Sequence, residues 1–144
     1  EFDGRDQMPR LGRFLFGDWL KAEAVDPVRD DGVEASAAAY TDAHGARHHR
    51  AITLSDGALI CRDTISGNFE EACLRWRLAP GEWHLEGDIV RNGTYSITIE
   101  IDGVQITPTL STTVESRYYQ RKAEIPEVSV KVSKPGILVT KVVF

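Results

Sequence analysis

The chain has 144 residues, of which 42% are hydrophobic and 27% charged, and its net charge is -5. This length and composition predict one soluble globular domain, residues 1–144, that can bury a core of its own. The acidic net charge argues against a generally basic binding surface, and no apolar run reaches the roughly 18 residues of a membrane helix. We therefore expect neither nucleic acid nor a membrane as a partner.

The first residues indicate a piece of a longer protein. The chain starts at Glu1 rather than at a methionine, and the stretch EFDGRDQ already resembles folded structure. No signal peptide is visible. We therefore expect a processed or excised part of a larger chain.

The first periodic segment is the alanine-rich stretch Val33–Tyr40, VEASAAAY. Alanine favours a helix, but this stretch is short, its side chains alternate, and turn residues flank it on both sides. We predict a strand here, with a short helix as the alternative.

Three of the four histidines follow, His44, His48 and His49. Because neighbouring strand residues point to opposite faces, His48 and His49 cannot both bind one metal ion without a bend in the chain. A turn at Gly45 accounts for the local polarity, so we predict a solvated hairpin tip and expect no cofactor. Zinc held by Asp42, His44 and one further histidine remains the alternative.

After the histidines, polar and apolar side chains alternate as far as a turn signal, Ser-Asp-Gly, at residues 55–57. If Ile52 faces the core, His48 and Arg50 share its side of the strand, whereas His49 lies on the other side.

The two cysteines, Cys61 and Cys73, lie symmetrically about Gly67. In a hairpin they would face each other, which leaves a disulfide and two free thiols both open, although most pairs at arbitrary spacing are free. A zinc site built on them is not expected, because no CxxC pair is present.

Apolar and polar side chains alternate clearly in three later segments, residues 72–78, 95–101 and 128–132. This period of two is typical of half-buried antiparallel strands. It places Trp76 on an apolar face, with Arg75 and Arg77 on the opposite one. Trp83 lies near a turn and is therefore the better candidate for stacking on a sugar ring.

The segment Glu115–Lys122, ESRYYQRK, combines two tyrosines with three basic residues. Tyr118 and Tyr119 point to opposite faces of a strand, and Arg117 and Arg121 share the side of Tyr119. A tyrosine beside arginines can stack on an acidic sugar or act on it as a general base. The alternative is a strand with one buried tyrosine and an exposed charged face.

Turn signals such as Asp-Gly and Arg-Asn-Gly separate these segments at short spacing, and such pairs favour tight hairpins. No helix-length pattern lies between them. We therefore predict an all-β fold, an antiparallel β-sandwich of two packed sheets with about 10 to 12 strands in a jelly-roll or supersandwich-like arrangement. No nucleotide-binding, hydrolase or metalloprotease motif is present, so no catalytic residue is assigned.

Four segments follow one another in an order typical of one known family. They are EFDGRDQMPRLGRF, ASAAAYTDAHGARHHRAITLSDGALICRDTISG, LRWRLAPG and VESRYYQRKAEIPEVSVKVSKPGILVTKVVF. In order, they resemble the part of the heparinase II/III-like polysaccharide lyases that follows the family's histidine motifs. The resemblance covers nearly the whole chain and depends on the order and spacing of the segments.

This resemblance implies a C-terminal β-sandwich that follows an α/α-toroid in a larger bacterial enzyme, located in the periplasm or outside the cell. Such enzymes cleave uronic-acid polysaccharides, glycosaminoglycans among them, by β-elimination. A base removes the proton α to the carboxylate while other groups neutralise that carboxylate. Most catalytic groups of the family lie on the toroid, so none is expected here, and the ligands of the zinc ion that some members bind have no matching positions.

Within the resemblance, His49 and Arg50 correspond to the first pair of the family's H-R-R motif, and Ala51 stands where a second arginine is common. The candidates for substrate contact are His49, Arg50, Trp83, Arg117 and Tyr119.

Three functions remain open. The first is the β-sandwich of a lyase, which supports the toroid, lines the cleft for an acidic polysaccharide and is inactive alone. The second is an autonomous carbohydrate-binding module. The third, a complete small lyase using Tyr118 or Tyr119 with a histidine, has the least support because no set of base, neutraliser and groove is evident.

Overall fold

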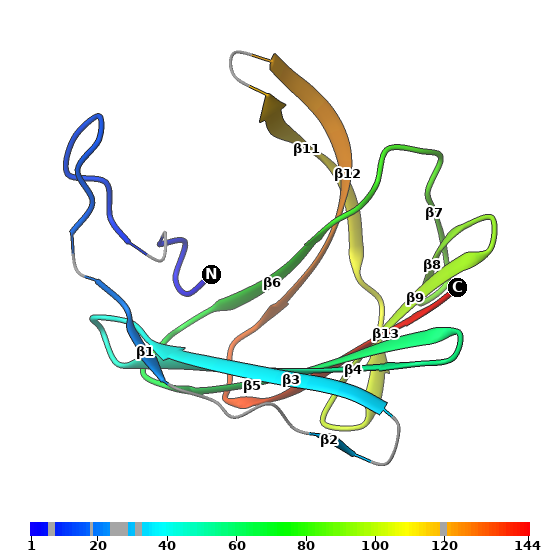
Figure 1. Ribbon diagram of the computed structural model, residues 1–144, viewed down its shortest axis with the longest axis horizontal. Coiled ribbons are helices and arrows are strands. Elements are labelled where there is room, and N and C mark those ends of the chain that lie inside the picture. Colours follow the sequence, from blue (N-terminus) through cyan, green and yellow to red (C-terminus); the bar gives the residue numbers. More distant parts are fainter. Residues whose placement is uncertain (6–7, 18, 24–28, 31–32, 119–120) are drawn as a thin grey trace.

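The computed structural model describes residues 1–144 except 6–7, 18, 24–28, 31–32 and 119–120 (Figure 1). The described residues form thirteen β-strands and no helix, hence no helix that is long and apolar enough to cross a membrane. The strands are β1 (Lys21–Glu23), β2 (Arg29–Asp30), β3 (Val33–Thr41), β4 (Ala46–Ser55), β5 (Ala58–Gly67), β6 (Ala72–Arg77), β7 (His84–Glu86), β8 (Ile89–Asn92), β9 (Tyr95–Ile101), β10 (Val104–Ile106), β11 (Thr109–Tyr118), β12 (Arg121–Val132) and β13 (Gly136–Val143).

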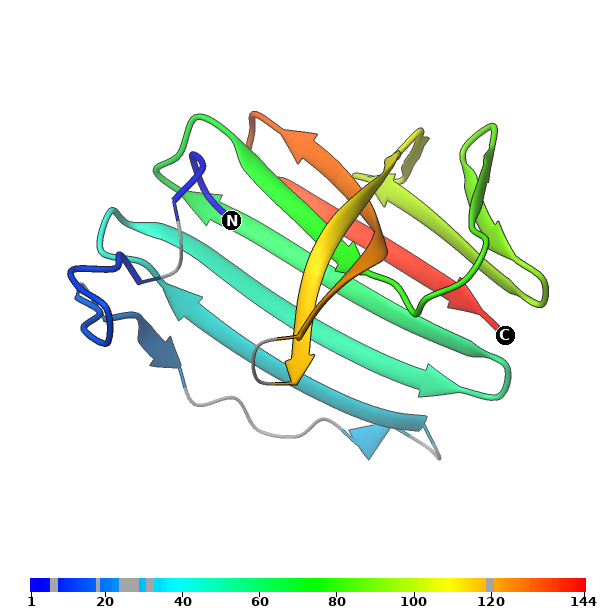
Figure 2. The same cartoon turned by 90° about the horizontal axis from the view of Figure 1, so that it is seen from above.

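The strands form two antiparallel sheets, which confirms the predicted β-sandwich. The larger sheet has the order β1-β3-β4-β5-β13-β9-β8-β7, with β10 paired to β9 and β2 to β3, and the smaller sheet has the order β11-β12-β6. The smaller sheet crosses one face of the larger one, and the far end of the β11–β12 hairpin extends away from it (Figures 1 and 2). The alanine-rich segment is strand β3, as predicted, and not a helix.

The structure has slightly more strands than the ten to twelve predicted. The strands β1, β2, β7 and β10 have only two or three residues each, so they leave almost no periodic pattern in the sequence.

The hydrophobic core lies between the two sheets. The alternating segments at residues 95–101 and 128–132 predict apolar faces turned to the core. Ile99 on β9 and Val128 on β12 belong to these faces, and both are 0% exposed. The remaining buried members come from both sheets and from the start of the chain: Phe2, Ala46, Ile65, Ala72, Leu78, Val90, Ile97, Val130 and Leu138.

The β4–β5 hairpin turns at Asp56 and Gly57, where the sequence predicts a tight turn. Ser55 pairs with Ala58, and Gly57 has a φ of 75°, which glycine adopts without strain. This register places each residue of β4 opposite a defined residue of β5, with Arg50 opposite Asp63.

Cys61 and Cys73 are free thiols that do not face each other across a hairpin. After Gly67 the chain leaves the larger sheet and enters the smaller one, so that Cys61 lies on β5 and Cys73 on β6. Their symmetric spacing in the sequence therefore does not reflect a shared hairpin.

The start of the chain is attached beside β6. Phe2 forms a β-bridge with Ala72, and the Asp3 carboxylate accepts hydrogen bonds from the backbone N–H groups of Glu70 and Glu71, at 2.8 and 2.7 Å. These contacts bury Phe2 and bring Glu1 to the space between the sheets.

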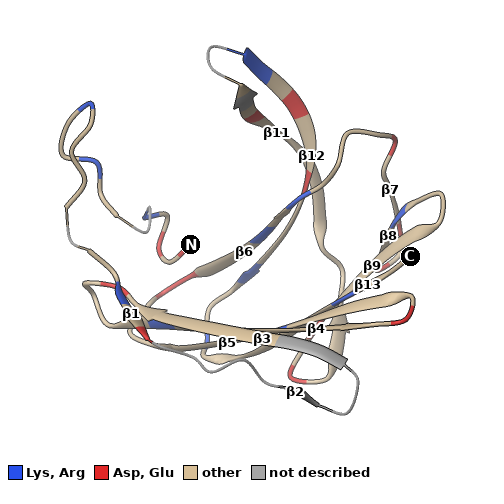
Figure 3. Ribbon diagram, viewed as in Figure 1, with Lys and Arg blue, Asp and Glu red and all other residues tan. Residues whose placement is uncertain are grey.

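Acidic and basic residues are interspersed along the strands (Figure 3).

Candidate functional site

The structure places the five predicted contact residues in different parts of the fold. Arg50 on β4 faces a pocket between the sheets, whereas His49 lies on the other face of the same strand. Trp83 belongs to the connection between β6 and β7, and the backbone of Arg117 belongs to β11. Tyr119 lies outside the described residues. Among the three of these whose side chains the structure describes, His49, Arg50 and Trp83, Arg50 lines this pocket.

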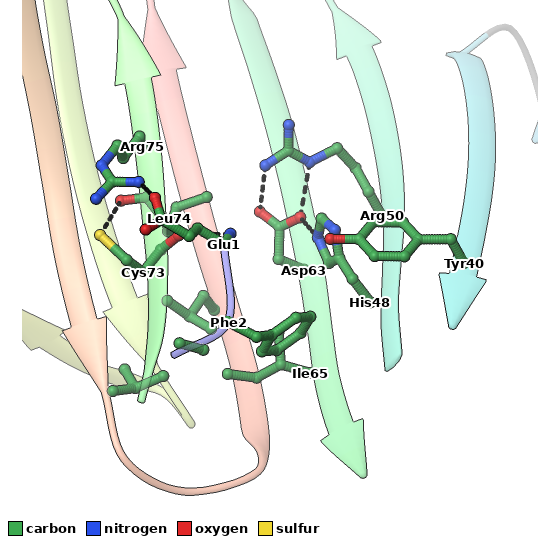
Figure 4. Close-up of a pocket in the computed structure, with 13 residues that line it drawn as sticks. Glu1, Phe2, Tyr40, His48, Arg50, Asp63, Ile65, Cys73, Leu74 and Arg75 are labelled. Atoms are coloured by element: carbon green, nitrogen blue, oxygen red, sulfur yellow. Dashed lines mark hydrogen bonds and ion pairs between the residues drawn. The ribbon is translucent and has the colours of Figure 1, made fainter. Parts of the chain in front are cut away.

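The pocket has a volume of about 220 Å³ and is lined by strands β3, β4 and β5 on one side and by β6 on the other (Figure 4). Its polar side chains on the larger sheet are Tyr40, His48, Arg50 and Asp63. Those on the other side are Glu1 and Arg75, and apolar residues such as Phe2, Ile65 and Leu138 complete the wall. We call this space the Asp63 pocket.

Asp63 is 1% exposed and accepts hydrogen bonds from two side chains of the neighbouring strand. Arg50 binds it through two nitrogens, with Nε 2.7 Å from Oδ1 and Nη2 3.1 Å from Oδ2, and the Nε2 of His48 lies 2.6 Å from Oδ1. The β4–β5 register explains the arrangement, because Arg50 is paired directly with Asp63 and His48 lies two residues earlier on the same face.

The electrostatics of the pocket favour an ionised Asp63. Burial by itself would raise the pKa of Asp63, but the hydrogen bonds and charges of His48 and Arg50 outweigh it and hold the pKa below its usual value. Burial would lower the pKa of Arg50, and its bond to Asp63 reverses this and raises it. Next to them, burial and the charge of Asp63 raise the pKa of the Cys61 thiol to about 12, so that thiol stays protonated.

Two aromatic rings hold the basic side chains in place. The guanidinium of Arg50 lies over the ring of Trp76, 4.6 Å from its centroid, and the Trp76 indole donates a hydrogen bond of 3.1 Å to the Thr140 hydroxyl. The ring of Tyr40 meets His48 edge-on, with 5.5 Å between the ring centroids. Both sheets therefore contribute contacts that position the side chains of the pocket.

Both arginines of the pocket are already paired with carboxylates. Arg75 forms ion pairs with Glu1 and with Glu127, the latter at 3.6 Å, and Arg50 is paired with Asp63. In contrast, neither the Tyr40 hydroxyl nor the Nδ1 of His48 makes a hydrogen bond within the described part of the chain. The Tyr40 hydroxyl can donate to a hydroxyl or carboxylate of a ligand, whereas the Nδ1 of a neutral His48 whose Nε2 donates to Asp63 can accept from a ligand hydroxyl.

The described residues contain no group of three or more histidine, cysteine, aspartate or glutamate side chains that could hold a metal ion. Asp42, a member of the zinc alternative, uses one oxygen to accept hydrogen bonds from the backbone of His44 and Ala46 and the other to bind Arg5. His48 binds Asp63. These groups thus already serve the hairpin turn and the pocket.

The sequence predicts Arg50 as a contact residue and places His48 on the same face, but it does not predict a site role for Tyr40 or Asp63. The signal that was available is the Asp-Gly turn at residues 56–57, because a two-residue hairpin pairs Arg50 with Asp63. The tyrosine that meets a histidine is Tyr40, whereas Tyr118, named in the third hypothesis, is 71% exposed near the tip of the β11–β12 hairpin.

The comparisons with known proteins concern the fold. No family model matches the sequence, and no curated protein matches it. Among solved structures, the heparan sulfate lyase HepC from Pedobacter heparinus is similar, with a TM-score of 0.69 and 12% sequence identity over 85% of this chain. The chain spans only 21% of the length of that lyase. The β-sandwich is thus structurally similar to part of a polysaccharide lyase.

Proposed function

We propose that this chain is the C-terminal β-sandwich domain of a polysaccharide lyase that cleaves a uronic-acid polysaccharide by β-elimination. It would support a separate toroidal catalytic domain, line the substrate cleft and be inactive alone, in a periplasmic or extracellular enzyme. The observation that carries the proposal is the fold similarity to HepC over 85% of the chain. Because this chain spans 21% of that lyase, a role as one part of a larger enzyme is favoured.

The side chains of the Asp63 pocket support the proposal that this domain lines the substrate cleft. A bound uronate needs hydrogen-bond donors and positive charge near its carboxylate, held in position before the reaction. His48 is oriented by Asp63, and the Tyr40 hydroxyl lies next to it, so both can serve a sugar at the mouth of the pocket. Arg50 is held at a fixed position by Asp63 and Trp76.

A second supporting feature is an exposed hairpin near the start of the chain. Arg10 and Phe16 form a β-bridge, and the N–H of Leu11 donates to the Leu15 carbonyl at 2.9 Å. Large apolar side chains of this segment are exposed: Leu11 65%, Phe14 86%, Leu15 61%, Phe16 45% and Trp19 77%. Apolar patches of this kind mark interaction sites, and in our proposal the toroidal domain covers them.

The proposal is tested by assaying the chain alone and joined to the upstream part of its parent protein on uronate polymers, following the absorbance of the unsaturated product. We expect no turnover from the chain alone and turnover from the joined protein. Turnover by the chain alone, or none by the joined protein on any uronate polymer, would overturn the proposal.

A substitution in the Asp63 pocket tests whether the pocket contacts the substrate. In the joined protein, His48→Gln should lower kcat/KM roughly tenfold, as expected when one hydrogen bond to the substrate is lost. The matched control is His44→Gln in the exposed β3–β4 turn, which lines neither this pocket nor the groove beside Trp83 and should leave kcat/KM unchanged. Equal effects of the two variants would remove the pocket from the proposed cleft.

The second candidate function is an autonomous carbohydrate-binding module. The observation that favours it is an open groove beside Trp83, on a part of the sandwich away from the Asp63 pocket. Tight glycan binding by the isolated chain, with no turnover by the joined protein, would favour this alternative.

A further inference from the structure

We propose that a groove beside Trp83 is a binding subsite for an uncharged pyranose unit of a glycan, separate from the Asp63 pocket. That the ligand is a glycan rests on the proposed function. The place of the subsite and its preference for an uncharged sugar rest on the groove itself. We call it the Trp83 groove.

The Trp83 groove lies between the β6–β7 connection and the edge strand β11. Glu82, Trp83 and His84 line one side, and Leu110, Ser111 and Thr112 line the other. Its volume of about 500 Å³ falls within the range of about 300–1,000 Å³ that is usual for small-ligand sites. It shares no lining residue with the Asp63 pocket.

The indole ring of Trp83 is held in place before any ligand binds. Its Nε1 donates a hydrogen bond of 3.0 Å to the Ala79 carbonyl. The ring of Tyr95 lies beside it, with 6.4 Å between the centroids and 39° between the planes, and the indole also packs partly against the core. A ring that is already ordered loses little conformational entropy when a ligand stacks on it.

The chemistry of the lining matches a pyranose. The ring of Trp83 offers an aromatic face for the C–H groups of a sugar, and the hydroxyls of Ser111 and Thr112 can donate and accept hydrogen bonds across the groove. Both hydroxyl-bearing side chains are exposed.

The charges of the lining decide between kinds of sugar. Glu82 is the acidic residue of the groove, and the lining of this described part of the chain includes no lysine or arginine. A uronate or sulfated unit would meet the like charge of Glu82, with His84 as the one basic side chain in the described lining, which costs binding free energy. The groove therefore favours an uncharged unit, in contrast to the Asp63 pocket with its two arginines.

The experiment uses the indole N–H signals of the three tryptophans in the ¹⁵N-labelled chain, with Trp83→Phe to assign the Trp83 signal. Neutral trisaccharides of glucose and of N-acetylglucosamine are titrated beside trigalacturonate as the acidic probe. We expect the Trp83 signal to shift with at least one neutral probe while the Trp19 signal stays in place. We expect the acidic probe to bind roughly tenfold more weakly.

Three variants test the contact directly. Trp83→Ala should weaken neutral-sugar binding roughly tenfold or more, as for a buried aromatic contact, and Trp83→Phe should keep most of it because an aromatic face remains. Trp19→Ala, at an exposed tryptophan outside the groove, should leave binding unchanged. If Trp83→Ala loses the dispersion of its NMR spectrum, Ser111→Ala tests the opposite wall and should weaken binding.

Several results would overturn the inference: no shift with any neutral probe, a shift at Trp19 alone, unchanged binding by Trp83→Ala, or equal binding of the acidic probe. Failure here together with turnover by the joined protein would remove the Trp83 groove and keep the proposed lyase function. A Trp83 shift together with no turnover by the joined protein would keep the Trp83 groove and remove the proposed lyase function.

Discussion

The Asp63 pocket and the Trp83 groove belong to the same sandwich but are built from different interactions. In the pocket, a carboxylate that is 1% exposed is held by His48 and Arg50 from the neighbouring strand. In the groove, Trp83 is positioned by one exposed hydrogen bond and a neighbouring ring. We expect the pocket to contribute strongly to the stability of the fold, because unpairing a buried charge is costly. The groove should contribute little to stability and mainly to binding.

The largest effect is expected from Asp63→Ala. The substitution leaves Arg50 without its carboxylate between the sheets, and we expect it to lower the free energy of unfolding by about 3 kcal/mol in urea titrations at pH 7. The control is Asp56→Asn in the exposed β4–β5 turn, which should change the free energy by less than about 0.5 kcal/mol. A loss below about 1 kcal/mol for Asp63→Ala would mean that water already screens the pocket charges.

The pH dependence of the unfolding free energy tests whether ionised Asp63 stabilises the fold. The folded pKa of Asp63 lies below that of the unfolded chain, about 3.9. Between the two values the unfolded state binds more protons, so the stabilisation by Asp63 is present above about pH 4 and is lost as the pH falls through the folded pKa. The difference in unfolding free energy between the wild type and Asp63→Asn should therefore shrink as the pH is lowered below 4. A difference that stays constant down to low pH would contradict the lowered pKa.

Trp76→Phe should have an intermediate effect. The change removes the hydrogen bond to the Thr140 hydroxyl, which is 0% exposed, and weakens the stacking with Arg50. We expect a loss of about 1 to 2 kcal/mol in the same unfolding assay. Trp19→Phe, at a side chain that is 77% exposed, is the matched control and should be close to neutral.

The smallest effect is expected from Trp83→Phe. It removes the exposed hydrogen bond to Ala79 and a small part of the packing of the ring against the core, so the unfolding free energy should fall by about 1 kcal/mol or less. Because the groove and the pocket share no lining residue, the effects of Trp83→Phe and Asp63→Asn should add within about 0.5 kcal/mol. Clear non-additivity would show that the pocket and the groove are energetically coupled.

Part of the candidate site follows from local sequence. Alternation places His48 and Arg50 on one face of β4, and the turn at Asp56 and Gly57 brings Arg50 opposite Asp63. A two-residue hairpin leaves only one register, so this pairing could have been predicted from the sequence without the larger fold.

Other contacts were beyond local sequence. Tyr40 joins the pocket through the pairing of β3 with β4, and Trp76 reaches Arg50 from the other sheet. The symmetric spacing of Cys61 and Cys73 was misleading, because the chain changes sheets between them. The alternation of apolar and polar side chains predicts a strand but does not predict which sheet the strand joins.

By itself, the sequence determined the all-β class, the half-buried strands and the tight turns, because side-chain alternation and turn chemistry act between near neighbours in the chain. Only the tertiary structure decided that the smaller sheet covers one face of the larger sheet and that Glu1 and Arg75 complete the Asp63 pocket. It also decided that the β6–β7 connection meets β11 to form the Trp83 groove. These contacts join residues far apart in sequence, and they depend on how the two sheets pack around one core.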